Sequence, residues 1–333
     1  MNKFSMLTVW LCVLVLIPAA VAPAAGQTPS HPRVVLISID GLRPDALDLA
    51  ETLTLDELIA TGSYHPMVLN ELPSATMTNH ASMLTGLSSL HHGLLLDIAL
   101  PGRIPSTTIF DLAHAAGLRT GFFVSKDKLA YLAGQAETDV RVIDPDTDAL
   151  LDQLVLAIET QDLDLIFLHL GQTDSVGHRY GWMSSQYLAA VAHADQQIAR
   201  LVEALDSAGL LDQTVIIVTA DHGGLGNCHA LNLPVNRLIP LIINGPGIAA
   251  GRTLCQPLHQ YDTAATILWL LSLAVPDDWD GQPVLEAAAE TIQPTCQPQP
   301  PPVGPPCMVL PLLLLACTFL LICHGRRRAL RAG

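Results

Sequence analysis

The sequence predicts one α/β domain whose doubly wound, mostly parallel sheet is covered by helices on both faces. Apolar strand-like runs alternate with helix-like segments, and the runs are continuous stretches of Val, Ile and Leu. Parallel strands that lie beneath helices on both faces need such runs, and the alternation is typical of α/β domains. Candidate metal ligands follow three of the runs, which places a site at the carboxyl ends of the strands.

The expected strands are Arg33–Ile39, Thr120–Val124, Leu165–Leu170, Thr214–Thr219 and Leu238–Ile243. The expected helices are Ser106–Ala116, Thr147–Glu159, Ser184–Ala208 and Tyr261–Leu273. Together these elements lie within residues 27–292, which we expect to form a single catalytic domain. About 270 residues are enough for one large domain with a full core.

Both ends of the chain are hydrophobic. Residues 1–26 are typical of a secretory signal peptide, because Lys3 precedes an apolar run that ends in small residues. An uncleaved anchor helix is the alternative for this segment. Residues 293–306 are rich in proline and predict a stiff, extended linker.

Residues 307–325 predict a transmembrane anchor, since the run Cys307–Cys323 has no charge and is dominated by Leu. The basic end, 326–333, would stay on the cytoplasmic side. A sorting tail that is cut off is the alternative. We therefore expect a single-pass protein of the cell membrane with its catalytic domain outside the cytoplasm, or a secreted or surface-anchored protein after processing.

The charge balance limits the partners. The net charge is −15, and every Asp and Glu lies between the two hydrophobic ends. Such a surface repels a nucleic-acid backbone, which argues against a polynucleotide partner. A small anionic substrate is compatible with it if bound metal cations supply local positive charge. The composition does not indicate an oligomeric state.

The cysteines fit an oxidising compartment. Cys228, Cys255 and Cys296 lie within or just after the expected domain, and an odd number leaves a free thiol or a pairing with Cys307. A bridge between Cys228 and Cys255 would brace the loop that follows the strand Thr214–Thr219.

Three acidic positions follow expected strands. Asp40 closes the run Arg33–Ile39 and precedes Gly41, and taken alone it would be assigned to helix capping. Asp174 and His178 lie four residues apart, which on a helical turn places both side chains on one face, within reach of one metal. Surface hydrogen bonding is the alternative for this pair.

The third position is Asp221-His222-Gly-Gly, directly after Thr214–Thr219, with His229 seven residues later. Neighbouring side chains on a strand point to opposite faces, so both can bind metal only if the chain turns, which the two glycines allow. Thr76 precedes an apolar helical start. A helix N-terminus suits an anionic phosphate, so Thr76 is either a helix cap or a nucleophile.

These motifs occur in one order along the chain: Asp40, Thr76 with Asn79, Asp174 with His178, Asp221-His222-Gly-Gly, and His229. In that order they resemble the alkaline phosphatase superfamily, and within it the type I phosphodiesterase/nucleotide pyrophosphatase branch. The resemblance covers about Arg33 to Val284. It departs at Met77-Thr78, where the branch often has Phe-Pro, and the missing aromatic side chain argues against stacking with a nucleotide base.

The resemblance implies a hydrolase of phosphodiester or related phosphate ester bonds with two divalent metal ions, expected to be Zn²⁺. One ion would be held by Asp40, Thr76, Asp221 and His222. The second would be held by Asp174, His178 and His229. Thr76 would form a covalent phosphothreonine, and Asn79 would donate a hydrogen bond to a phosphate oxygen. A phosphotransferase, a phosphomonoesterase or phosphonate hydrolase, and a binding protein with a degenerate site are the alternatives.

Overall fold

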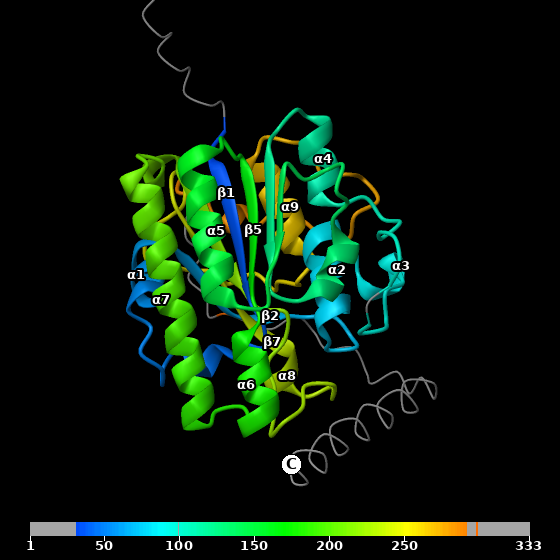
Figure 1. Ribbon diagram of the computed structural model, residues 1–333, viewed down its shortest axis with the longest axis vertical. Helices are drawn as coiled ribbons and strands as arrows, with labels where there is room; N and C mark the ends of the chain where they lie inside the picture. Colours follow the sequence, from blue (N-terminus) through cyan, green and yellow to red (C-terminus); the bar gives the residue numbers. More distant parts are fainter. Residues whose placement is uncertain (1–30, 99, 292–297, 299–333) are drawn as a thin grey trace, which may run out of the picture. The chain divides into compact units, whose positions relative to one another are not determined.

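An eight-stranded sheet organises the residues that the computed structural model describes, which are 31–98, 100–291 and 298 (Figure 1). The strand order is β4-β3-β5-β1-β6-β7-β2-β8. Strands β4, β3, β5, β1 and β6 are parallel, whereas β7 is antiparallel to both β6 and β2. The predicted mostly parallel sheet is therefore confirmed. The strands are β1 (Arg33–Ile39), β2 (Ser63–Leu69), β3 (Thr120–Val124), β4 (Val140–Ile143), β5 (Leu165–Leu170), β6 (Thr214–Thr219), β7 (Leu238–Asn244) and β8 (Arg252–Thr253).

The described helices lie on both faces of the sheet (Figure 1). Helices α1 and α5 each pack against α7 on one face, and α2, α4 and α9 pack against one another on the other. The α-helices are α1 (Leu53–Thr61), α2 (Thr76–Thr85), α3 (Ser89–His92), α4 (Ile109–Ala115), α5 (Thr147–Thr160), α6 (Gln172–Tyr180), α7 (Ser185–Ser207), α8 (Pro234–Arg237) and α9 (Asp262–Leu270). Short 3₁₀ turns are η1 (Pro44–Ala46), η2 (Asp127–Leu132), η3 (Leu211–Gln213) and η4 (Leu285–Ala287).

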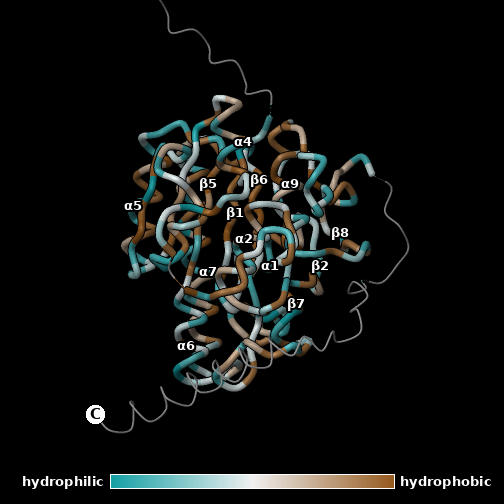
Figure 2. The backbone as a smooth tube through the Cα atoms, turned by 90° about the vertical axis from the view of Figure 1, so that its right-hand side faces the viewer, coloured by the Kyte–Doolittle hydropathy of each residue, from teal (hydrophilic) through white to brown (hydrophobic). Residues whose placement is uncertain are grey.

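The pattern of buried residues shows why helices cover both faces of the sheet. All six residues of β5 and of β6 are buried, as continuous apolar strands between two helical layers should be. In Figure 2 the residues of the central strands are mostly hydrophobic, whereas hydrophilic residues lie on the outer helices and turns. In α7 the buried positions recur every three to four residues, which turns one stripe of the helix to the core.

Local chemistry shifted one predicted helix boundary. The segment predicted to be helical from Ser106 becomes helix only at Ile109, because Thr108 and Asp111 form a capping box that fixes the start. Strand β2 was not predicted: it contains Pro66, and its pairing with β7 shifts between His65 and Val68. A proline in a strand usually argues against strand structure, and here the pairing irregularity accommodates it.

The strand register places the predicted ligands together. In the sheet β1 lies between β5 and β6, and Ser38 is paired with His169 on one side and Thr219 on the other. The carboxyl ends of these three strands therefore lie side by side. The Asp40 N–H donates to the Leu170 carbonyl at 3.0 Å, which brings the residue after β1 next to the end of β5.

The membrane location predicted from the sequence was wrong, as the described helices show. No helix among the described residues is both long enough and apolar enough to cross a membrane. A span needs about 20 apolar residues, and the longest described helix, α7, carries charges such as Asp195 and Arg200. We therefore withdraw the assignment to a single-pass cell-membrane protein. The predicted signal peptide (1–26), anchor (307–325), basic end (326–333) and, apart from residue 298, linker (293–306) lie outside the described residues.

His92 generates a prediction about acid stability. It is buried, its Nδ1 accepts a hydrogen bond from Leu94 N at 3.0 Å, and its Nε2 lies 3.0 Å from Ser82 Oγ on α2. Burial lowers its pKa from 6.5 to about 4. The unfolded chain therefore binds a proton at higher pH than the folded chain does. The stability from neutral His92 is present above pH 6.5 and is lost as pH falls towards 4.

Between pH 6.5 and 4 the unmutated protein should take up about one more proton on unfolding than His92→Gln does. The free energy of unfolding, measured by urea titration at several pH values, tests this. His91→Gln is the matched control, because the neighbouring His91 side chain is 63% exposed. An identical pH slope in His92→Gln and the unmutated protein would contradict the prediction.

Candidate metal centre

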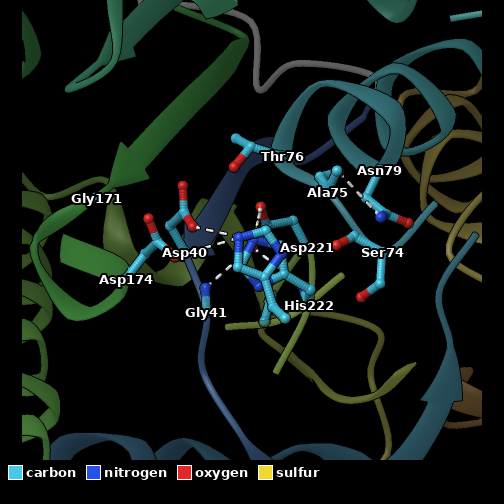
Figure 3. A network of polar contacts seen from close by, with 12 residues as sticks. Asp40, Gly41, Ser74, Ala75, Thr76, Asn79, Gly171, Asp174, Asp221 and His222 are labelled. Atoms are coloured by element: carbon cyan, nitrogen blue, oxygen red, sulfur yellow. Dashed lines mark hydrogen bonds and ion pairs between the residues drawn. The ribbon is translucent and has the colours of Figure 1, made fainter. Parts of the chain in front are cut away.

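The predicted ligands meet at the carboxyl ends of β5, β1 and β6. Asp40 follows β1, Asp174 lies in the first turn of α6 after β5, and Asp221 and His222 follow β6. Figure 3 shows these side chains facing one another next to Thr76. Asp40, Asp221 and His222 are fully buried and Asp174 is 4% exposed. Three carboxylates thus share one buried region.

Asp40, Asp221 and His222 form the first group. His222 Nε2 lies 3.5 Å from Asp40 Oδ1 and 3.3 Å from Asp221 Oδ2. The other oxygen of Asp221 accepts hydrogen bonds from the N–H groups of Gly41 and His222, each at 3.0 Å. Gly41 has φ +75°, and a Cβ on it would lie 3.2 Å from Asp174 Cα. Glycine is therefore needed for both the turn and the close approach.

The second group surrounds Asp174. His178, one helical turn later on α6, places Nε2 3.3 Å from Asp174 Oδ1, as the four-residue spacing predicted. His229 Nε2 lies 3.9 Å from the same oxygen. The rings of His229 and His222 stack with centroids 3.7 Å apart, so the two groups are contiguous. The structure brings together all the predicted Asp and His ligands.

The three histidines are anchored in the same way. The Nδ1 atoms of His178, His222 and His229 lie within 2.9 Å of the carbonyl oxygens of Asn227, Gly223 and Ser74, respectively. A carbonyl can only accept, so each Nδ1 carries the proton and each Nε2 is a lone-pair donor. This arrangement is common for metal-binding histidines.

Four atoms that face the centre of these groups lack hydrogen-bond partners among the described residues: Asp40 Oδ1, Asp174 Oδ1, Asp221 Oδ2 and His222 Nε2. Buried polar atoms are normally paired. Two sets of ligand atoms lie close enough together to hold a metal ion: Asp40, Asp221 and His222, and Asp174, His222 and His229. Carboxylate oxygens and imidazole nitrogens are ligands that suit divalent metals such as Zn²⁺. The residues present therefore fit divalent metal ions, and the two sets share His222, which offers one nitrogen and can bind one ion.

The carboxylates differ in pKa. Burial alone would raise the pKa of Asp40 and of Asp174, but the Lys126 ammonium holds both pKa values below their usual range. Burial, followed by repulsion from Asp40, raises the pKa of Asp221. Burial and the neighbouring His222 lower the pKa of His229 to about 3. His229 is therefore neutral near pH 7, as a metal ligand must be.

Thr76 begins α2, a helix whose ten residues are all buried. Its carbonyl lies 2.8 Å from Nδ1 of His80, whose Nε2 lies 2.9 Å from Ser38 Oγ on β1. The next amide, Met77 N, donates to Asp97 Oδ1 at 3.0 Å. These contacts fix the first turn of α2 against β1, with Thr76 beside Asp40 and Asp221 (Figure 3).

Asn79 lies apart from the acidic cluster. Its Oδ1 accepts from Glu71 N at 2.7 Å, and its Nδ2 donates to the Ala75 carbonyl at 3.1 Å. In Figure 3 it faces Ala75 and Ser74. Asn79 thus braces the loop that leads to Thr76, and a hydrogen bond from it to a phosphate oxygen stays a prediction.

Three further side chains contribute to the site without having been predicted. Lys126 forms ion pairs with Asp40 and Asp174, and His169 Nε2 lies 2.9 Å from Asp40 Oδ2. The Trp182 indole donates to the Gly41 carbonyl at 2.8 Å and borders His178 edge-on. Lys126 and His169 lie at the ends of β3 and β5, which are neighbours in the sheet. The strand order, once known, is the signal that would have found them.

Cys228 precedes His229, and the structure shows both Cys228 and Cys255 as disulfide-bonded. This agrees with the predicted oxidised state of these two cysteines. The pairing between them stays a prediction, and Cys296 and Cys307 lie outside the described residues.

A family model described as type I phosphodiesterase / nucleotide pyrophosphatase matches residues 34–98 and 119–244, more than half of the chain. The chain belongs to this family. The matched ranges contain every predicted ligand from Asp40 to His229, together with Lys126. Membership confirms the resemblance that the motifs suggested.

A curated relative is ectonucleotide pyrophosphatase/phosphodiesterase family member 7 from Homo sapiens. It is 28% identical over 247 residues, which cover 66% of this chain and 53% of the relative. The chain thus spans about half the length of the curated relatives that it matches.

Solved structures share the fold of this phosphodiesterase family member. Murine ectonucleotide pyrophosphatase/phosphodiesterase 5, an inactive variant in complex with AMP, has a TM-score of 0.65 at 15% identity, covering 75% of this chain and 98% of that one. Phosphonate monoester hydrolase of Agrobacterium radiobacter has a TM-score of 0.64 at 17% identity, covering 80% and 79%, respectively. The predicted alkaline-phosphatase-like fold is confirmed.

The contacts of Asn79 predict a structural effect on the loop before α2. Asn79→Ala leaves Glu71 N and the Ala75 carbonyl without their side-chain partner, which should lower the free energy of unfolding by about 1–3 kcal/mol. Asn79→Asp keeps the acceptor for Glu71 N but turns a carboxylate oxygen towards the Ala75 carbonyl at a fully buried position, so it should lose at least as much. Urea unfolding of the three proteins at pH 7 provides the measurement. An unchanged free energy in Asn79→Ala would contradict the bracing role.

Proposed function

We propose that this protein is a phosphodiesterase-type hydrolase that cleaves phosphodiester or related phosphate ester bonds with two divalent metal ions and a threonine nucleophile. Family membership supports the reaction class. The proposal is carried by four buried carboxylate and imidazole atoms that face one another beside Thr76, at the start of α2. Within the part of the chain that the structure describes, these atoms have no hydrogen-bond partner.

In the proposed centre one ion, expected to be Zn²⁺, is held by Asp40, Asp221, His222 and Thr76. The second is held by Asp174, His178 and His229. His222 also lies within reach of the second group, so the two ions would be neighbours. When bound, such a pair supplies Lewis-acid charge to the attacking and leaving oxygens of an in-line displacement.

Thr76 is the proposed nucleophile. Its hydroxyl oxygen would bond to phosphorus as the leaving-group oxygen departs, forming a phosphothreonine that water then cleaves. Its place at a helix N-terminus suits an anionic phosphoryl group. The solved relative in complex with AMP is described as inactive, and its variant replaces a threonine by alanine. That description supports a threonine with the same role in this chain.

Burial protects the chemistry. Thr76 is 1% exposed, and the proposed ligands are buried except His178, whose side chain is 23% exposed. His80 is neutral near pH 7, because burial lowers its pKa to about 4. A neutral His80 can hydrogen-bond to the Thr76 carbonyl and to Ser38 Oγ, and it carries no positive charge that would attract the anionic substrate away from the metal groups. The chain's own contribution is to position the hydroxyl, exclude bulk water and orient the ligands.

The proposed activity can be tested on purified full-length protein with a panel of esters. The panel contains bis-nitrophenyl phosphate, nitrophenyl phosphate, dinucleotides and phosphonoacetate, each with and without prior removal of metal by a chelator. We expect ester hydrolysis that is lost on chelation and restored by Zn²⁺. A protein with stoichiometric zinc that hydrolyses none of these substrates would contradict the proposed function.

The nucleophile generates a prediction. Thr76→Ala should abolish turnover of the preferred ester while leaving zinc content close to that of the unmutated protein, because only one of several ligands is lost. Thr76→Ser keeps a hydroxyl and should keep partial activity. Thr78→Ala, on the same helix, is the matched control and should remain active. Turnover by Thr76→Ala at the unmutated rate would rule out the covalent step.

The second metal group generates another prediction. Asp174→Asn and His178→Ala each weaken one group and spare Asp40 and Asp221, so zinc measured by mass spectrometry should fall from about two ions per chain to about one. Turnover should fall with it, because the charge that stabilises the leaving oxygen is lost. Two tightly bound zinc ions in both variants would show that this group is not a metal site.

A further inference from the structure

Lys126 lies between the two candidate metal groups. Its Nζ is 2.6 Å from Asp40 Oδ2 and 2.7 Å from Asp174 Oδ2, and its side chain is 20% exposed. Asp40 belongs to the first group and Asp174 to the second. One ammonium therefore holds a carboxylate from each.

The two oxygens of each carboxylate differ in their partners. In both, Oδ2 binds Lys126, whereas Oδ1 has no hydrogen-bond partner among the described residues. The Oδ1 atoms face the histidines of the candidate metal groups: Asp40 Oδ1 lies 3.5 Å from His222 Nε2, and Asp174 Oδ1 lies 3.3 Å from His178 Nε2. Besides Lys126, Asp40 Oδ2 has His169 Nε2 at 2.9 Å. The ammonium and a metal ion can thus use the same carboxylate at the same time.

Lys126 is also the compensating charge of the cluster. Among the ion pairs of the described residues, it is the only Lys or Arg that contacts Asp40, Asp174 or Asp221. The histidines near these carboxylates supply no positive charge when they are neutral. A buried carboxylate without a compensating charge is strongly unfavourable.

The backbone before Lys126 is fixed to the end of β5. Ser125 Oγ accepts a hydrogen bond from Gly171 N at 2.8 Å and lies 2.9 Å from His169 Nδ1. These contacts tie the end of β3 to the start of α6, which carries Asp174. The backbone that carries Lys126 is thus held in place by contacts at the carboxyl ends of β3 and β5.

We propose that Lys126 is a positioning residue that ties the two metal groups together and serves as their resident counter-charge. It holds the outer oxygens of Asp40 and Asp174 so that the inner oxygens face the metals. This proposal rests on the proposed two-metal function. It predicts that Lys126 matters most when the metals are absent, because bound ions neutralise the same carboxylates.

The test compares thermal unfolding of full-length protein with and without saturating Zn²⁺. Removing one partner of a buried ion pair is strongly destabilising, so Lys126→Met should lower the Tm of the zinc-free protein by about 10 °C. The zinc-saturated protein should lose less than half of that shift. Zinc thus stabilises Lys126→Met more than it stabilises the unmutated protein.

Lys128→Met is the matched control. Lys128 has a similar exposure of 17%, but its Nζ binds Asp97 Oδ1 at 2.7 Å. Its Tm loss should be the same with and without zinc. Lys126→Arg keeps the charge and should recover at least half of the zinc-free loss.

Equal Tm losses with and without zinc in Lys126→Met, a larger loss with zinc, or no loss would overturn the proposal. If Lys126→Met does not fold without zinc, Lys126→Met/Asp174→Asn should fold, because one of the two carboxylates that lose Lys126 is then neutral and the other, Asp40, keeps His169. Failure of the double variant as well would overturn it. The zinc-free comparison does not depend on catalysis, so a failure to hydrolyse esters would count against the proposed function and leave this result to be judged separately.

Discussion

The burial of three carboxylates at one edge of the sheet is the constraint on which the rest of the site depends. Asp40, Asp174 and Asp221 are almost completely inaccessible to water. Buried carboxylates are stable only if cations or hydrogen-bond donors compensate them. The outer oxygens meet this demand with Lys126, His169 and the Gly41 amide. The inner oxygens have no such partner among the described residues, and those are the atoms that a pair of metal ions would satisfy.

The sheet creates this concentration of charge. Because β1 lies between β5 and β6 in parallel register, the residues that follow the three strands must converge. A Cβ at Gly41 would lie only 3.2 Å from Asp174 Cα, and the φ of +75° disfavours any side chain, so glycine suits the turn after β1. Histidines from α6 and from the loop after β6 then enter with Nδ1 anchored on carbonyls. Topology brings the ligands together, and backbone hydrogen bonds orient them.

The sequence predicted the central strands well because buried parallel strands are continuous apolar runs: four of the five predicted strands have the observed bounds, such as Leu165–Leu170. It did not predict β2, because Pro66 within a segment argues against a strand. This strand pairs irregularly with β7, in the antiparallel part of the sheet. The candidate ligands next to strand ends could be proposed from their spacing, and the structure brings them close together. Lys126 was not, since its role depends on β3 lying beside β5, and strand order cannot be read from local patterns.

The charge balance links metal occupancy to substrate binding. With the three carboxylates ionised, Lys126 alone leaves the cluster with two net negative charges, on a chain whose net charge is already −15. A phosphate ester is an anion and would be repelled from such a site. Two divalent ions add four positive charges and reverse the sign to two net positive. The same carboxylates that would repel the ester in the metal-free protein would then create, through the proposed metal ions, the local field that attracts it.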